Sequence, residues 1–215
     1  VGATVFSIAQ MREARRQQRE ALRAAQRATA LSDLQSVLAG DARDPDGRPL
    51  PPAGRIAMAE GVITRRFGSD PSLAASLMVD LSGRYVEAGD LKAQRAMLGK
   101  ARAIALEANL GAEVALATCW RANSYWLEDI LDSARADVAE GKAALARDKY
   151  RDHEAEATCL EAEGKLLQAT GKPDSGIALL KRAVRIEEDE PGSTEALGRM
   201  NSLAEVLRLS GRIRE

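Results

Sequence analysis

Four turn signals recur at nearly equal spacing along the larger, C-terminal part of the chain. When LSGRYVEAGDLKAQ, RANSYWLEDILDSA, EGKLLQATGKPDSG and AEVLRLSGRIRE are aligned, the turns fall at Gly89, Asp129, Gly171 and Gly211. These four corner residues are 40, 42 and 40 positions apart. Self-similarity at a fixed period in this range is the signature of stacked copies of one supersecondary unit. The repeat therefore predicts a solenoid.

The residues around each corner predict a pair of antiparallel helices. A large apolar residue stands four positions before each corner, one helical turn away, where it can pack between the paired helices. These residues are Tyr85, Tyr125, Leu167 and Leu207. After three of the corners, a large residue and then a small one recur at fixed offsets, as Leu98 and Ala101, Val138 and Gly141, and Leu180 and Ala183. The small residues allow close helix approach, and the fourth unit has only its first helix.

Composition agrees with helices and limits the possible partners. Apolar residues make up 45% of the chain but aromatic residues only 3%. A core of Ala, Leu, Val and Ile suits closely packed helices, so we predict an all-α fold. The 31 basic and 32 acidic residues leave a net charge of -1, and without a global positive field we expect no nucleic-acid partner.

The N-terminal segments have a different character. Residues 1–9, VGATVFSIA, form an apolar run that is too short to cross a bilayer, which needs about 20 residues. We interpret it as the tail of a transmembrane segment, with anchoring through the segment before residue 10; a secretion signal or a plain helix start are the alternatives. Residues 10–39 lack Gly and Pro and predict one long helix, a juxtamembrane stalk that is basic first and then amphipathic.

The remaining boundaries follow from the turn formers. Residues 40–54 hold several Pro and Gly residues and predict an irregular linker. A short helix is expected over Arg55–Phe67, and Pro71 is well placed in the first turn of the next helix. We therefore assign residues 55–215 to the helical repeats, with the last repeat incomplete.

Two cysteines, Cys119 and Cys159, and one histidine, His153, leave no spacing typical of a structural zinc site. Both cysteines fall near the start of neighbouring first helices. We expect two buried, unpaired thiols, because free cysteine is commonly part of a core. A disulfide in an oxidising compartment is the alternative.

The corner pattern is similar to the tetratricopeptide repeat. A large apolar residue, a four-residue step to a glycine corner and a small residue in the second helix occur from Leu73 to about Arg214, with repeats of about 40–42 residues. The resemblance implies a tetratricopeptide-like α-solenoid of antiparallel helix pairs. Asp129 departs from it, because it replaces the corner glycine.

The order of segments resembles a second, larger arrangement. An apolar end, an Arg/Gln/Ala helix, a DPDG linker, a short helix and FGSDPSLAASLMVDLSGRYVEAGD look like the region after the membrane span in bacterial receptor-type serine/threonine protein kinases. The resemblance implies an inner-membrane protein whose tetratricopeptide-like sensor is periplasmic.

The chain carries no catalytic motif. It lacks the Gly-rich loop, HRD and DFG of a kinase, and its one histidine, His153, belongs to no recognisable Ser/His/Asp or Cys/His constellation. The acidic run Glu187–Glu190 is interpreted as a solvated helix end rather than a cation site. We therefore expect a binding domain without enzymatic activity, cofactor or metal.

The expected binding surface is the concave side of the stack, which first helices line in such folds. Counting along the helices from the packing residues gives the candidate groove residues Asn123, Trp126, Glu161, Lys165, Gln168, Asn201, Glu205 and Arg208. Trp126 is the expected anchor for a peptide or protein ligand, whereas Trp120 is expected in the core.

Two functions follow from this interpretation. The first is an extracytoplasmic ligand-sensing or peptide-docking domain of a membrane-anchored kinase, which signals through the stalk helix. The alternative is a soluble cytoplasmic tetratricopeptide adaptor that binds a partner protein. The unfinished last repeat is expected to leave Leu203 and Leu207 uncovered, which makes a homodimer possible.

Overall fold

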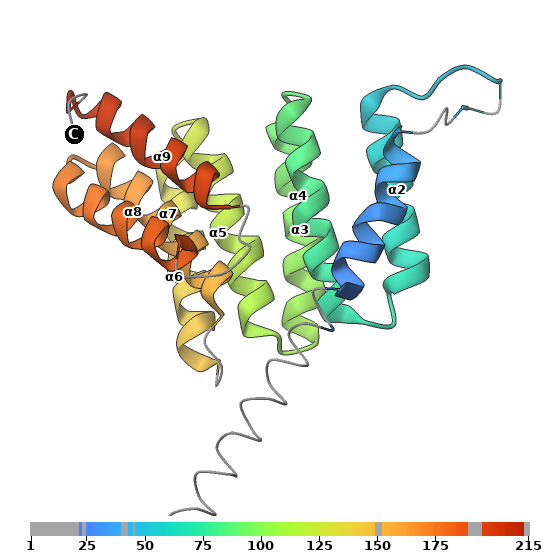
Figure 1. Cartoon of the computed structure of the whole chain (residues 1–215), viewed down its shortest axis with the longest axis horizontal. Coiled ribbons are helices and arrows are strands. Elements are labelled where there is room, and N and C mark those ends of the chain that lie inside the picture. The colour runs from blue at the N-terminus through green and yellow to red at the C-terminus, as the bar shows by residue number, and fades with distance from the viewer. Residues whose placement is uncertain are drawn as a thin grey trace, which may run out of the picture.

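The computed structural model describes residues 22, 25–39, 43–44, 46–148, 152–188 and 195–212 (Figure 1). Residues 25–39 are helical. The elements that follow are α2 (Pro52–Phe67), α3 (Pro71–Glu87), α4 (Leu91–Glu107), α5 (Gly111–Leu127), α6 (Leu131–Arg147), α7 (His153–Ala169), α8 (Pro173–Glu188) and α9 (Ala196–Leu209). No strand occurs in the described ranges, which contain an isolated bridge between Arg43 and Pro49. The all-α prediction is confirmed.

Two predicted N-terminal segments lie wholly or partly outside the described residues. The apolar run 1–9 is not described, nor is most of the basic half of the predicted stalk. Helix α2 begins at Pro52, three residues before the predicted start at Arg55, with Pro51 as its N-cap. Proline suits the first turn of a helix because the amide that it lacks would have no partner there.

The predicted corners share one backbone geometry. Each has a positive φ, in the left-handed region, with values of 74° at Gly89, 58° at Asp129, 79° at Gly171 and 72° at Gly211. The next amide donates to the carbonyl of the large apolar residue before the corner, as in Asp90 to Tyr85 (2.8 Å), Ile130 to Tyr125 (2.9 Å), Lys172 to Leu167 (2.8 Å) and Arg212 to Leu207 (2.8 Å). This bond closes a Schellman turn and satisfies a carbonyl at the end of the first helix.

A fifth left-handed corner was not predicted. Asn109, between α4 and α5, has φ 57°, and the amide of Leu110 donates to the carbonyl of Ala105 at 2.9 Å. Asparagine is among the non-glycine residues that tolerate this conformation. The connection between the α3–α4 and α5–α6 pairs thus has the same left-handed turn as the corners within pairs.

Aspartate caps fix the starts of three helices. The side chains of Asp70, Asp90 and Asp152 accept the amide of the third residue of α3, α4 and α7. Each satisfies one of the orphan amides of a first turn. Caps and corners together set the helix lengths, and therefore the distance over which neighbouring pairs stack.

The helices stack as antiparallel pairs in an α-solenoid, from residues 25–39 at one end to α9 at the other (Figure 1). Among the described residues, the backbones of α3 and α5, of α5 and α7, and of α7 and α9 approach closely, whereas those of α4, α6 and α8 do not approach one another. The side chains of Arg102 on α4 and Glu140 on α6 still form an ion pair at 2.7 Å. A stack that is tight on one side and open on the other curves toward the tight side. We call the layer of first helices, α3, α5, α7 and α9, the inner wall.

Glycines permit the closest helix approaches. A Cβ on Gly141 of α6 would lie 2.5 Å from Sγ of Cys119 and 3.0 Å from Sγ of Cys159. A Cβ on Gly176 of α8 would lie 2.4 Å from the carbonyl oxygen of Gly164 on α7. No larger residue fits at these positions without moving the helices apart.

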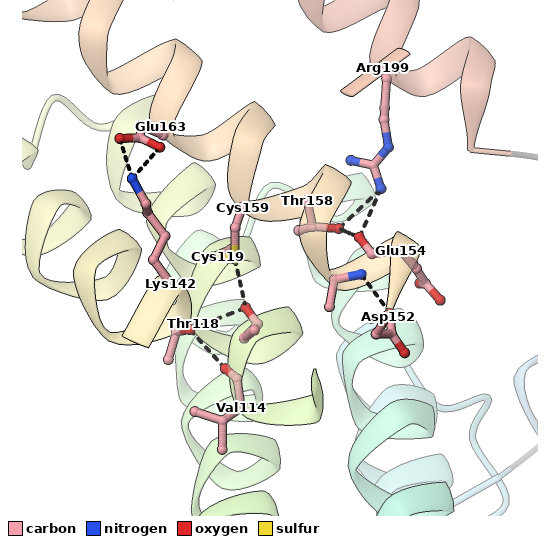
Figure 2. The surroundings of a disulfide bond; sticks show 12 residues. Val114, Thr118, Cys119, Lys142, Asp152, Glu154, Thr158, Cys159, Glu163 and Arg199 are labelled. Atoms are coloured by element: carbon pink, nitrogen blue, oxygen red, sulfur yellow. Dashed lines mark hydrogen bonds and ion pairs between the residues drawn. A yellow bond between two sulfur atoms is a disulfide. The ribbon is translucent and has the colours of Figure 1, made fainter. Parts of the chain in front are cut away.

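The expectation of two unpaired thiols is wrong, because Cys119 and Cys159 form a disulfide between α5 and α7 (Figure 2). Their separation is 40 residues, whereas the corners of their two units, Asp129 and Gly171, are 42 residues apart, so Cys159 lies two positions earlier in its unit than Cys119 does. With the Cα atoms only 5.0 Å apart, the two first helices are within disulfide range. The bond joins consecutive units of the inner wall.

Two packing expectations need correction. Leu207 is only 9% exposed and packs with Ile177, Leu180 and Val206, because α9 lies against α8. Leu203 is partly buried against the same cluster. Trp120 is not fully enclosed either, although it packs against the main core. The exposed apolar side chains of α9 are instead Leu197, Met200 and Leu209.

Replacing Asp129 by glycine is expected to stabilise the fold. The residue has φ 58°, and a left-handed conformation costs a residue with a Cβ about 1–2 kcal/mol, part of which is offset by the greater freedom of glycine in the unfolded chain. Urea unfolding should show a gain of about 0.5–1 kcal/mol for Asp129→Gly. The matched reverse change, Gly89→Ala, should lose a similar amount; a loss in both variants would contradict this account.

Candidate functional site

The predicted groove residues occupy two environments on the inner wall. Asn123, Glu161 and Lys165 are buried, with exposed fractions of 6%, 4% and 8%. Trp126, Gln168 and Glu205 are partly buried, and Asn201 and Arg208 are exposed. The structure thus divides the predicted set into an enclosed part and an open part.

Arg199 of α9 encloses the buried part. Its side chain donates to Glu161 of α7 (2.8 Å), to Glu187 of α8 (2.9 Å) and to the hydroxyl of Thr158 (3.1 Å). The hydroxyl of Ser202 also donates to Glu161, at 2.8 Å. Arg199 is 2% exposed. Glu161 is therefore an internal ion-pair partner that joins α7 to α9, not the open groove residue that the sequence predicts.

Lys165 is also turned inward. Its amine donates to Oε1 of Glu161 at 2.7 Å. The same amine lies 5.3 Å from the centre of the Trp126 ring. A cation over an aromatic face is attracted by the ring quadrupole. Lys165 and Trp126 therefore stabilise each other across α7 and α5, and the ring keeps only part of its surface for a ligand.

The charge state of Glu161 reflects these neighbours. Burial alone raises its pKa, but the charges of Lys165 and Arg199 and the hydrogen bond from Ser202 outweigh burial, so the pKa lies below its usual value. Ionised Glu161 consequently stabilises the fold above its unfolded pKa of about 4.3. This contribution is lost as the pH falls through the lower pKa of the folded state.

Asn123 has an unusual environment. Its side chain is buried, yet neither its Oδ1 nor its Nδ2 has a hydrogen-bond partner among the described residues. A buried amide without partners costs about 1–3 kcal/mol. The position is not open to solvent, so Asn123 does not itself offer a contact to a ligand in this conformation.

A second arginine ties the N-terminal helix to the inner wall. Arg27 donates from Nε to Oδ2 of Asp80 on α3 (2.9 Å) and from Nη1 to Oε2 of Glu154 on α7 (3.0 Å). Its hydrogen bonds to Asp80 raise the pKa of the guanidinium against the effect of partial burial, and the charge of Glu154 adds to this. Ala30 and Leu34 of the same helix join the main core. The end of the predicted stalk is thus packed into the solenoid.

The two arginines meet at Glu154. Its carboxylate accepts a hydrogen bond from Arg27. Its backbone carbonyl accepts one from Nη2 of Arg199 at 3.5 Å (Figure 2). A continuous set of polar contacts therefore runs from the N-terminal helix through α7 to α9. The start of α7 is the point at which all three meet.

Several carboxylate side chains surround the start of α7. The pKa of Glu195 is raised by burial and by the nearby charges of Glu154, Glu187 and Asp80, while Arg199 opposes the shift. The pKa of Asp152 is raised by burial, with Glu154 adding to the shift and the amide of Ala155 opposing it. The inner wall at this level therefore favours cations.

Other kinds of site receive no support from the described residues. No group of three or more His, Cys, Asp or Glu side chains there is arranged to hold a metal ion. A cavity of about 620 Å³ lies between residues 35–39, α2 and the end of α3, and none of the predicted groove residues lines it. Within the described ranges, no helix combines the length and apolar character that crossing a bilayer requires.

Sequence reasoning missed Arg199, Arg27, Asp80 and Glu154. One signal could have identified Arg199: it is seven residues before Val206, so it lies on the same helical face as a core residue. A charge on that face must find a partner. Nothing comparable marks Arg27, because its partners lie 53 and 127 residues away.

Arg199→Ala is expected to cost about 3–5 kcal/mol of unfolding free energy, because it leaves Glu161 and Glu187 buried with fewer cationic partners. Arg182→Ala is the matched control: Arg182 pairs with Glu156 at 2.5 Å, but its side chain is 52% exposed. The control should lose less than about 1 kcal/mol. Chemical denaturation measures both, and similar small losses would show that the buried network contributes little.

Comparison with known proteins finds no relative of this chain. No family model matches the chain, no curated protein matches it, and no solved structure matches it. Functional inference therefore depends on the residues and geometry of the chain itself.

Proposed function

We propose that this chain is the extracytoplasmic docking domain of a membrane-anchored bacterial serine/threonine kinase. In this proposal the inner wall binds a protein or peptide, and the N-terminal helix carries the signal toward the membrane. The domain itself performs no catalysis. The kinase parent and the membrane anchor rest on the order of segments along the sequence.

The observation that supports the proposal is the contact of the N-terminal helix with the inner wall. Arg27 bonds Asp80 and Glu154, which belong to two non-adjacent first helices, α3 and α7. A ligand that alters the spacing of these helices changes the partners of Arg27. Binding at the wall and the position of the helix are then linked, which is the requirement for a sensor that acts through a stalk.

The surface of the wall supports docking. Trp126 on α5 and Gln168 on α7 are partly exposed, and Arg208 on α9 is exposed. Aromatic and arginine side chains are the residue types that most often anchor protein interfaces. Successive first helices thus present anchor groups along one continuous layer.

The disulfide supports the extracytoplasmic location over the cytoplasmic adaptor. Cys119 and Cys159 are paired and buried. Disulfides form and persist in oxidising compartments such as the bacterial periplasm and are rare in the reducing cytoplasm. An adaptor in the cytoplasm would hold these two side chains as thiols.

The compartment is tested by the redox state of the pair in the cells that make the protein. Cells are quenched in acid, the protein is denatured, and free thiols are labelled with a maleimide polymer that shifts the mass on a gel. We expect no labelling of the full chain unless a reductant is added first. Labelling of both cysteines without reductant would place the domain in a reducing compartment.

Docking is tested with random twelve-residue peptides displayed on phage and selected on the purified protein. The affinity of selected peptides should fall at least tenfold, or about 1.4 kcal/mol, in Trp126→Leu and in Arg208→Ala. Lys92→Ala on α4, an exposed residue of an outer helix, is the matched control and should bind as the parent does. Peptides that bind all variants equally would move the docking surface away from the inner wall.

A further inference from the structure

The contact of Arg27 has the geometry of a recognition site. Nε and Nη2 of the guanidinium bond the two oxygens of Asp80 at 2.9 and 2.5 Å, while Nη1 and Nη2 bond the two oxygens of Glu154 at 3.0 and 3.4 Å. One planar guanidinium therefore satisfies two carboxylates from different repeats. Such a fork matches arginine and not the single ammonium of lysine.

The site remains accessible, unlike the network around Arg199. The side chains of Arg27, Asp80 and Glu154 are 29%, 21% and 34% exposed, whereas that of Arg199 is 3% exposed. A partly hydrated ion pair exchanges partners more readily than one that is sealed from water. Asp80 and Glu154 can thus be reached by a guanidinium from outside the chain.

Electrostatics favour a cation at this position even without Arg27. Glu195 lies within electrostatic range of both Glu154 and Asp80, so a further carboxylate adds negative charge near the pair. Among the described residues, Arg199 also bonds the backbone carbonyl of Glu154, but its side chain is already bonded to Glu161 and Glu187. The carboxylate pair Asp80–Glu154 would then attract a replacement cation.

The remaining attachments of the N-terminal helix do not depend on Arg27. Ala30 and Leu34 pack into the core, and Asp33 pairs with Arg66 of α2 at 2.7 Å. Exchange of the Arg27 contact can therefore release the end of this helix that faces α7 while residues 30–39 keep their packing. A ligand that bonds Asp80 and Glu154 would therefore release the end of the N-terminal helix that contains Arg27.

We propose that Asp80 and Glu154 form a docking site for an arginine side chain of a partner peptide, and that Arg27 occupies this site in cis until the peptide displaces it. The inference rests on the proposed docking function and specifies its ligand chemistry and its regulation. The cis arginine sets the threshold for binding, because a ligand must compete with it. Displacement frees the start of the described helix, which is the element assigned to signalling.

The test compares affinities for a capped nine-residue peptide of Ala and Gln with one central Arg. We expect Arg27→Ala to bind this peptide at least tenfold more tightly than the parent chain. Adding Asp80→Asn should remove the gain, and a central Lys in the peptide should bind at least fivefold more weakly. Arg66→Ala, which breaks a different ion pair of the same helix, with Asp33, is the matched control and should behave as the parent.

Several outcomes would overturn the inference. Equal affinities of the parent and Arg27→Ala would do so, as would a gain that survives Asp80→Asn. Dimerisation of Arg27→Ala that Asp80→Asn abolishes would assign the site to a second copy of the chain instead of a peptide. If phage-selected peptides bind the inner wall regardless of Asp80, the docking function stands and the arginine site fails.

A second measurement uses the unaltered chain, in case the variants fold poorly. Amide hydrogen exchange over residues 25–29 is followed while the arginine peptide is titrated to saturation. Exchange there should become at least threefold faster, with residues 34–39 unchanged. Saturation with no change in exchange would show that the peptide does not displace Arg27.

Discussion

The four predicted corners and the α4–α5 connection turn through a residue with positive φ, and the stacking of the helices depends on this geometry. The left-handed residue directs the next amide back to the carbonyl of the large apolar residue one turn earlier. The same residue that closes the first helix therefore also packs between the two helices of its pair. Because the bond is repeated at Tyr85, Tyr125, Leu167 and Leu207, successive pairs leave their corners in the same way and can stack in register.

The close approach of neighbouring helices then determines which side chains the inner wall can contain. Gly141 lies against the Cys119–Cys159 bond, and Gly164 faces Gly176. Helices this near to one another exclude water from the side chains between them. Charges buried between helices must be paired. This explains why Glu161 of α7 and Arg199 of α9 bond each other, so that the protein's own side chains fill part of the predicted open groove.

The inner wall therefore contains two ionic groups with different physical character. The group around Arg199 is sealed and holds α7, α8 and α9 together. The group around Arg27 is partly hydrated and holds the N-terminal helix to α3 and α7. A sealed pair fixes a structure, whereas a hydrated pair can change partners at moderate cost. This difference separates the residues that maintain the stack from those that suit recognition.

The sequence alone determined the elements that depend on local chemistry. Periodic corners, proline in first turns and an Ala-rich composition predicted the all-α repeats, and the four predicted corners all have positive φ. Glycine and apolar spacing act over a few residues, so a sequence reading can identify them. The same reasoning placed Trp126, Gln168 and Arg208 on first helices, where the structure leaves at least part of each exposed.

Tertiary structure decided which distant side chains meet. The pairing of Cys119 with Cys159, the burial of Glu161 and Lys165 beneath Arg199, and the contact of Arg27 with Asp80 and Glu154 join residues from separate helices. Such contacts depend on the angle and distance between helices, to which many weak packing interactions contribute. Periodicity specifies the face of a helix on which a side chain lies, but the packing of neighbouring helices decides whether that face is open, buried or paired.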